Sequence, residues 1–288
     1  MTLRHLKIFV AVCKHGSTTK AADALYIAQP TISLTISELE KYYNVTLFDR
    51  INQRLILTDI GKELLVKAKD ILSGFEDFEA LATFSGKSPK VKIGATLTLG
   101  QTLIPKFLKR IKEENLNIRP QILIRQASTL ENELEQGNLD FAVIGGDIVS
   151  PYLTATHISR ERFIAVANAD YDVPSSLTLK EFVSYPLLLL EYGSSSRKLL
   201  EEIVSAKGLR VSPIIDSSNN QALVTALNES LGIAYLTDSY VLEYIAKKKF
   251  KEIVIEDLTT SRSNNLVIHK SKKLNTLQQQ AYNLMKTL

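Results

Sequence analysis

The segment Ser17–Arg50 restricts the fold more than any other part of the chain, because it reads as two short helices separated by a tight turn. Ser17 can cap the first helix, since its hydroxyl accepts a backbone N–H of the first turn. Tyr26–Ala28 leaves room only for a turn, and Pro30 suits the first turn of the second helix. An apolar stripe recurs in the second helix at spacings of four and three, at Ile32, Ile36 and Leu39. We therefore predict a helix-turn-helix.

The other face of the second helix carries small, mostly hydroxyl-bearing side chains. Such side chains at the start of a reading helix can approach base edges and phosphates in the major groove. We expect DNA contacts from the starts of the two helices and from this face, at Thr18, Thr19, Gln29, Pro30, Thr31, Ser33, Leu34, Thr35 and Ser37.

Residues 44–57 alternate weakly between polar and apolar and read as a hairpin wing. Arg50 and Arg54 flank its turn, residues 51–53. Two arginines beside a reading helix can hold phosphate or enter the minor groove. The alternative is a pair of solvated surface charges, which we would prefer without the preceding helix-turn-helix.

The N-terminal segment of about sixty residues resembles the DNA-binding domain of the LysR-type transcriptional regulators. The resemblance rests on Leu3, Phe9, Val12, Gly16, Ser17, Thr19, Ala21, Ala22, Leu25, Gln29, Pro30, Ser33, Ile36, Leu39, Glu40, Leu47, Phe48, Arg50, Arg54, Leu57, Thr58 and Gly61. Many members of that family have Arg and Gln where this chain has Leu34 and Thr35. Base readout is therefore expected from Gln29, from thymine-methyl contacts by Pro30 or Leu34, and from DNA shape.

A long amphipathic helix follows the wing, with Thr58 as its cap. Its apolar residues are spaced 4, 3, 4, 3, 4, at Leu64, Ala68, Ile71, Phe75, Phe78 and Ala82. This a/d seam favours a partner helix, and a two-fold dimer would present two heads to a near-palindromic site. The alternative is that the seam packs on the chain's own C-terminal domain.

Residues 85–89 break the helix, and an α/β pattern follows. The strands are expected at 91–93, 121–124, 141–144, 163–167, 187–190, 233–236 and 266–269, and the helices at 103–112, 130–136, 197–207, 221–229 and 238–247. The layout resembles the LysR effector domain, which has the two-lobed architecture of periplasmic solute-binding proteins. The resemblance implies three segments, 1–58 for DNA, 59–86 as linker and dimerisation helix, and 87–288 for the effector, with lobe I at about 90–160 and 264–288 and lobe II at about 161–263.

Two loops are candidates for a ligand in the cleft that this resemblance implies. Ligands of α/β sheets bind beyond the carboxyl ends of strands, often at helix starts. The first loop, 94–100, offers Thr96, Leu97 and Thr98, and the second offers Gly193, Ser194, Ser195, Ser196 and Arg197, which favour a carboxylate or similar anion. Ordinary helix capping would use the same residues. Ser128 is a weaker candidate, because the family has Ser or Thr where this chain has Ala127, and the turn 219–221 is secondary.

The bulk properties alone do not argue for DNA binding. The chain has 288 residues, a formal net charge of +4 and one cysteine, Cys13, which fits a reducing cytoplasm and which we expect to be a buried apolar group rather than a redox sensor. No apolar run could span a bilayer.

The resemblance implies a homodimer or homotetramer, double-stranded DNA, RNA polymerase and a small anionic metabolite as partners, with no cofactor. The GSSSR turn, residues 193–197, resembles that of the family members that regulate sulfur and nitrogen assimilation or carbon fixation.

Two other functions are alternatives for this sequence. One is a metabolite-binding protein whose helix-turn-helix contacts another protein, which a DNA shift assay would distinguish. The other is an enzyme with Ser194 or Ser196 as nucleophile. That reading lacks a recognisable base, since His157 and His269 are the only histidines beyond the head, and there is no Gly-x-Ser-x-Gly elbow.

Overall fold

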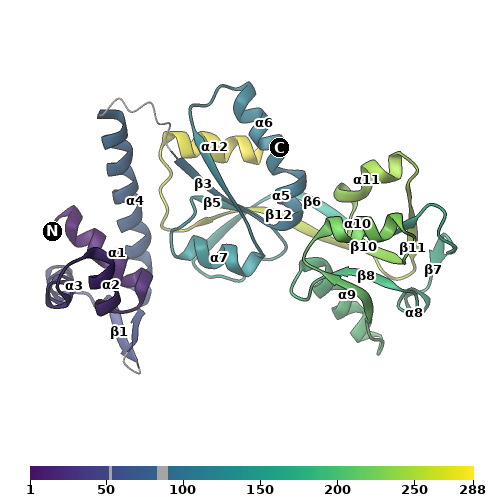
Figure 1. Cartoon of the computed structure of the whole chain (residues 1–288), viewed down its shortest axis with the longest axis horizontal. Coiled ribbons are helices and arrows are strands. Elements are labelled where there is room, and N and C mark those ends of the chain that lie inside the picture. The colour runs from purple at the N-terminus through teal and green to yellow at the C-terminus, as the bar shows by residue number, and fades with distance from the viewer. Residues whose placement is uncertain (52–53, 83–89) are drawn as a thin grey trace.

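A computed structural model describes residues 1–51, 54–82 and 90–288, and Figure 1 shows a head, an upright helix and two lobes in a row. The head contains α1 (Leu3–His15), α2 (Thr18–Leu25), α3 (Gln29–Tyr43) and a hairpin of β1 (Phe48–Ile51) and β2 (Arg54–Leu57). The predicted helix-turn-helix and wing are therefore present. The Ser17 hydroxyl accepts from the Lys20 N–H at 3.4 Å, and Tyr26 takes the left-handed conformation that reverses the chain.

The upright helix is α4 (Asp59–Ala82), and the Thr58 hydroxyl caps it by accepting from the Gly61 N–H at 3.0 Å. The predicted seam is divided. Ala68 is buried in the head's own core and Leu64 packs against that core, because the first half of α4 lies on α1. Ile71 and Phe78 are instead 49% and 65% exposed and belong to none of the hydrophobic clusters found among the described residues. The Ala82 side chain and the predicted boundary, residues 85–89, lie outside the described part.

The remainder of the chain forms the two lobes. Lobe I contains β3 (Lys90–Ala95), α5 (Leu97–Thr102), α6 (Ile104–Glu113), β4 (Arg119–Ile124), α7 (Ala127–Glu135), β5 (Phe141–Gly145) and α12 (Thr276–Lys286). Lobe II contains β7 (Ser176–Leu177), α8 (Leu179–Phe182), β8 (Leu187–Leu190), α9 (Ser195–Ala206), β9 (Pro213–Ser217), α10 (Asn220–Asn228), β10 (Ile233–Thr237), α11 (Asp238–Ala246) and β11 (Phe250–Ile255). The mixed helix and sheet content is as expected.

Two long strands, β6 (Leu153–Asn168) and β12 (Thr260–His269), run from lobe I into lobe II (Figure 1). They pair antiparallel from Leu153 opposite His269 to Phe163 opposite Thr260, with an irregularity between Asn264 and Asn265. Lobe I adds the parallel order β4-β3-β5, whose β5 pairs antiparallel with β12, and lobe II adds the parallel order β10-β8-β9, whose β10 pairs antiparallel with β6. The boundaries between the two lobes, expected near residues 160 and 264, fall inside these two strands.

The structure corrects the residues after the first strand of lobe I, which we expected to be a loop. Leu97–Thr102 is a helix, α5, in spite of Gly100. A Cβ on Gly100 would lie 2.7 Å from the Ile124 Cδ1 atom, so glycine is present for close packing rather than for loop freedom. Five further elements, β7, α8, β9, β11 and α12, were not expected from the sequence.

Among the described helices, none combines the length and the apolar character that a bilayer crossing requires.

Candidate nucleic-acid interface and ligand-binding site

The start of α3 is fastened to α2 through one glutamine. The Gln29 Nε2 atom donates to the Thr18 hydroxyl at 3.1 Å and to the Ser33 hydroxyl at 2.8 Å. Gln29 is itself exposed, so this amide lies at the surface of the head at the start of α3. The contact fixes the side chain in one orientation, which is a condition for base-specific hydrogen bonding.

Most of the predicted DNA-contacting side chains lie on the surface of the head. Thr19, Gln29, Pro30, Thr31, Leu34 and Ser37 are exposed or partly exposed, and Thr18 and Ser33 are half-buried. Thr35 is a correction: it is only 6% exposed and belongs to the buried face. Its position three residues after Ile32 places it on the apolar stripe, so its hydroxyl does not share the outer face with Leu34.

The wing is attached to α3 by a carboxylate. The Glu40 Oε1 atom accepts from the backbone N–H of Leu47 at 2.7 Å and of Phe48 at 3.3 Å. This contact sets where β1 begins, and the Phe48 side chain is buried in the head core. Arg50 follows on the exposed part of β1. The Arg54 side chain and the turn residues 52–53 lie outside the described part.

Cys13 packs against the head core, and burial raises the pKa of its thiol to about 12. At pH 8 this leaves roughly a thousandfold less thiolate than an ordinary cysteine has. We expect a maleimide or disulfide reagent to label native Cys13 at least about a hundredfold more slowly than the unfolded chain. The unfolded thiol ionises first as pH rises from about 9 to 12, so the free energy of unfolding should fall across that range. Fast labelling of the native protein at pH 8 would contradict this burial.

The first predicted ligand loop is buried rather than open. The Thr96 hydroxyl, 8% exposed, accepts from the Gly145 N–H at 3.3 Å and so joins the ends of β3 and β5 inside lobe I. Thr98 is also buried, and its hydroxyl accepts from the Asn220 Nδ2 atom of lobe II at 3.4 Å. Leu97 is half-buried between them, and Ser128 is exposed at the start of α7.

Asn220 is the residue of lobe II that meets α5. Its Nδ2 atom also donates to the Gln101 Oε1 atom at 2.8 Å, and Asn220 is 1% exposed. Its Oδ1 atom is buried without a hydrogen-bond partner among the described residues. A buried, unpaired acceptor costs free energy, so this junction is suited to a ligand that supplies a donor.

The second predicted loop forms the start of α9. Gly193 has φ +93°, and the Ser194 hydroxyl accepts from the Arg197 N–H at 3.3 Å as an ordinary cap. Ser196 and Arg197 are buried. The Arg197 Nε atom donates to Glu201 at 2.6 Å, whereas its buried Nη1 atom makes no hydrogen bond among the described residues and lies 3.9 Å from the Asp216 Oδ2 atom. The same turn can therefore cap α9 and contact an additional anion.

The sequence did not identify Arg262, which connects the second loop to the crossover strands. Its Nη1 atom donates to the Ser195 hydroxyl at 2.7 Å, and its Nε and Nη2 atoms donate to Glu161 at 3.1 and 2.9 Å. A Cβ on Gly145 would lie 2.6 Å from the Arg262 Cζ atom, so only glycine admits the guanidinium there. Two adjacent glycines, Gly145 and Gly146, directly after a buried strand were the available signal for this close approach.

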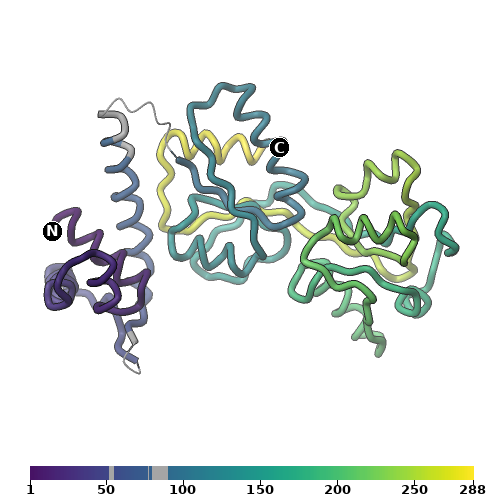
Figure 2. Tube along the Cα trace, in the orientation of Figure 1, coloured from purple at the N-terminus to yellow at the C-terminus, as the bar shows by residue number. Residues whose placement is uncertain are grey.

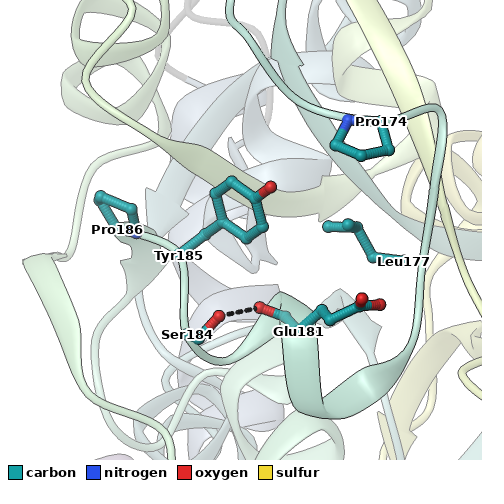
Figure 3. Close-up of a pocket in the computed structure, with 6 residues that line it drawn as sticks. All are labelled: Pro174, Leu177, Glu181, Ser184, Tyr185 and Pro186. Atoms are coloured by element: carbon teal, nitrogen blue, oxygen red, sulfur yellow. Dashed lines mark hydrogen bonds between the residues drawn. The ribbon is translucent and has the colours of Figure 1, made fainter.

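A cavity of about 280 Å³ lies away from this junction, in the α8 region of lobe II. Figure 3 shows its lining, in which the Ser184 hydroxyl donates to the Glu181 carbonyl at 2.6 Å. It is formed by Pro174, Leu177, Glu181, Ser184, Tyr185 and Pro186. None of the predicted ligand residues contributes to it.

Comparison with known proteins matches both parts of the chain to one family. Residues 3–62 match the family described as bacterial regulatory helix-turn-helix protein, lysR family, and residues 85–287 match the LysR substrate binding domain. The HTH-type transcriptional activator CmpR of Synechocystis is 26% identical over 96% of this chain and 92% of its own length. A probable RuBisCO transcriptional regulator of Porphyra purpurea is 26% identical over 99% and 95%.

Solved structures share the fold. A full-length OxyR variant from Pseudomonas aeruginosa matches with a TM-score of 0.66 at 20% identity, covering 99% of this chain and 93% of that one. The regulatory domain of Synechocystis CcmR, in complex with 2-PG, matches 68% of this chain and 95% of its own with a TM-score of 0.62 at 14% identity.

Proposed function

Because the chain belongs to the LysR family of transcriptional regulators, we propose that it binds operator DNA through residues 1–58 and that a small anionic metabolite between its lobes controls it. It is a DNA-binding transcriptional regulator with an effector-binding domain. The observation that carries this conclusion is the match of both domains, in order, across nearly the whole chain. The identity of the DNA-contacting and effector-contacting residues is our proposal.

The exposed start of α3 supports a reading role in the major groove. Leu34 is 60% exposed on the face that carries Thr31 and Ser37, and an apolar side chain there suits a thymine methyl group. Gln29 offers the amide for a base or phosphate contact, and Arg50 on the wing offers a cation for the backbone. This set reads few bases directly, so DNA shape contributes to operator choice.

Replacing Arg50 with Ala should weaken binding to operator and random DNA by similar factors and lower the salt slope by about one. The reason is that a phosphate contact releases counterions without reading sequence. The matched control is Arg210→Ala, which removes an exposed arginine of lobe II. Binding titrations across a salt series measure both slopes. An Arg50→Ala slope equal to that of the parent protein would reject the phosphate role.

An anionic effector at the lobe junction is supported by two buried arginines, Arg197 at the start of α9 and Arg262 on β12, whose Nη1 atom donates to Ser195 of α9. Thr98 and Asn220 approach each other from opposite lobes at the same junction. A ligand that contacts both lobes would stabilise one relative orientation of them, which is how binding reaches the heads. The 2-PG complex of CcmR, and the carbon-fixation regulators among the relatives, make small organic acids and phosphates the first compounds to test.

Replacing Thr98 with Val removes one hydroxyl at constant shape and should lower effector affinity about tenfold, which corresponds to roughly 1.4 kcal/mol. DNA affinity without effector should not change. Thr225→Val is the control, since Thr225 is exposed on α10. The assay is a thermal-shift screen of organic acids that includes 2-PG, followed by titration of the best hit. If the hit binds both variants equally and still alters DNA binding, the effector site lies elsewhere.

We further propose a homodimer or homotetramer formed through α4, contact with RNA polymerase, and a cytoplasmic location, because the operator DNA is there. We assign no cofactor and no enzymatic role. The position of His269 supports a role other than catalysis. This histidine is buried at the far end of β12, where its Nδ1 atom accepts from the Ser271 N–H at 3.1 Å. It is therefore not a base for Ser194 or Ser196.

A further inference from the structure

The charged face of α4 lies directly against lobe I. In Figure 1 the helix stands beside this lobe, and Figure 2 shows the same arrangement along the Cα trace. Contacts extend from Asp59 to Asp70, about 16 Å along the helix axis. A Cβ on Gly137 of lobe I would lie 3.3 Å from the Val66 Cα atom, so the two backbones are close in the middle of this contact.

The lower end of the contact is centred on one tyrosine of lobe I. The Tyr152 hydroxyl donates to the Asp59 Oδ1 atom at 2.6 Å, and the Lys62 Nζ atom donates to the same hydroxyl at 3.3 Å. Lys62 also lies 5.0 Å from the centroid of the Tyr152 ring. The ring is held from behind by His269, whose plane is nearly parallel at a centroid distance of 6.5 Å.

The upper end is a buried lysine between two aspartates. The Lys272 Nζ atom donates to Asp70 of α4 at 2.6 Å and pairs with Asp140 of lobe I at 2.9 Å. Burial lowers the pKa of Lys272, but the two carboxylates outweigh it and the net pKa is raised, so the ammonium stays charged. Asp140 is fixed within lobe I by the Lys92 N–H at 2.7 Å and by Gln278 at 3.0 Å.

A third contact lies between these ends. The Lys69 Nζ atom donates to the Gln136 carbonyl at 2.6 Å and to the Asn138 Oδ1 atom at 2.5 Å. Most of these contacts are polar, and one buried apolar residue of α4, Val66, lies among them beside Gly137. Polar interfaces of this kind can separate without exposing a core, unlike the buried packing of α4 on α1.

We propose that these three contacts form a clamp that holds the DNA-binding head against lobe I of the same chain, with Lys272 as the buried charge at its upper end. The clamp begins where β12 ends, and β12 also carries Arg262 at the lobe junction. β12 therefore connects the lobe junction directly to the turn that holds Asp70. The regulatory consequence rests on the proposed function, whereas the clamp itself requires neither DNA nor effector.

The test measures the distance between head and lobe I in the full chain. Spin labels are placed at Lys14→Cys in α1 and Lys106→Cys in α6, both exposed, with Cys13 changed to Ala. Co-assembly with excess unlabelled chain ensures that only distances within one chain are recorded. The parent protein should give one narrow distance distribution. The Asp70→Asn/Tyr152→Phe protein should lose it, because both ends of the clamp are released.

Glu76→Gln is the matched control, since it removes an exposed carboxylate from the same helix. Its distribution should equal that of the parent. Calorimetry of every variant checks folding, and Lys272 keeps Asp140 as a partner when Asp70 is changed. If the double variant unfolds, the test uses Tyr152→Phe alone. This change leaves every buried charge paired, and it should broaden the distance distribution. An unchanged distribution in a folded variant overturns the clamp, and this result is independent of any DNA or effector measurement.

Discussion

Replacing Ile71 with Glu should convert the protein into monomers and abolish cooperative operator binding, while the head and both lobes stay folded. The residue is 49% exposed on α4, and Phe78, seven positions later, is 65% exposed. Phe75 lies between them, with its ring stacked on Phe78 at a centroid distance of 6.4 Å. The other faces of α4 are occupied by the head core and by lobe I, so this strip is what remains for a partner.

The expected effect is large because of symmetry. A two-fold interface would place the new carboxylate near its own copy and remove two apolar side chains from the contact. Burying unpaired charges costs several kcal/mol, which is more than the free energy by which a helix pair of this length stabilises the dimer. Val254→Glu is the control, because it adds a carboxylate at a 58% exposed apolar position of β11. Light scattering measures the mass, and a dimer of unchanged mass would show that the strip is not the interface.

The head was predictable because its determinants are local. Ser17 and Thr58 cap helices that begin within three residues of them, and the stripe of Ile32, Ile36 and Leu39 needs only helical periodicity. The same periodicity, applied more strictly, would have placed Thr35 inside. The division of the seam was not predictable, because whether Ala68 faces a partner or its own α1 depends on how the helix leaves the wing.

The candidate site was predictable only in part, since it is assembled from distant segments. Thr98 and the serines of α9 were found because strand ends and helix starts have sequence signals. For Arg262 the adjacent glycines 145 and 146 signalled a close approach but not its partner, because Glu161 lies 101 residues earlier and only the pairing of β6 with β12 brings them together. β9 escaped notice because it begins with proline, and α5 because Gly100 resembles a loop residue.

Replacing Arg262 with Met should destabilise the effector domain by about 3–5 kcal/mol. Arg262 and Glu161 are 8% and 7% exposed, and their atoms approach to 2.9 Å. The neutral side chain leaves the Glu161 carboxylate buried with the Ser239 hydroxyl, at 2.6 Å, as its remaining side-chain donor. A carboxylate without its counter-ion loses far more in desolvation than the hydroxyl returns. The melting temperature of this domain should fall by about 10 °C.

The physical cause can be isolated with a second change. If the cost is the unpaired carboxylate, then Glu161→Gln in the Arg262→Met background should recover part of the lost stability, with a coupling of about 1–3 kcal/mol. Arg110→Met is the matched control, because Arg110 pairs with Glu114 at 2.7 Å on the exposed face of α6 and should cost less than about 1 kcal/mol. Calorimetry that resolves the head from the effector domain measures each step. Additive effects of the two substitutions would mean that Arg262 stabilises the junction by packing against Phe163 and Gly145, and not by neutralising Glu161.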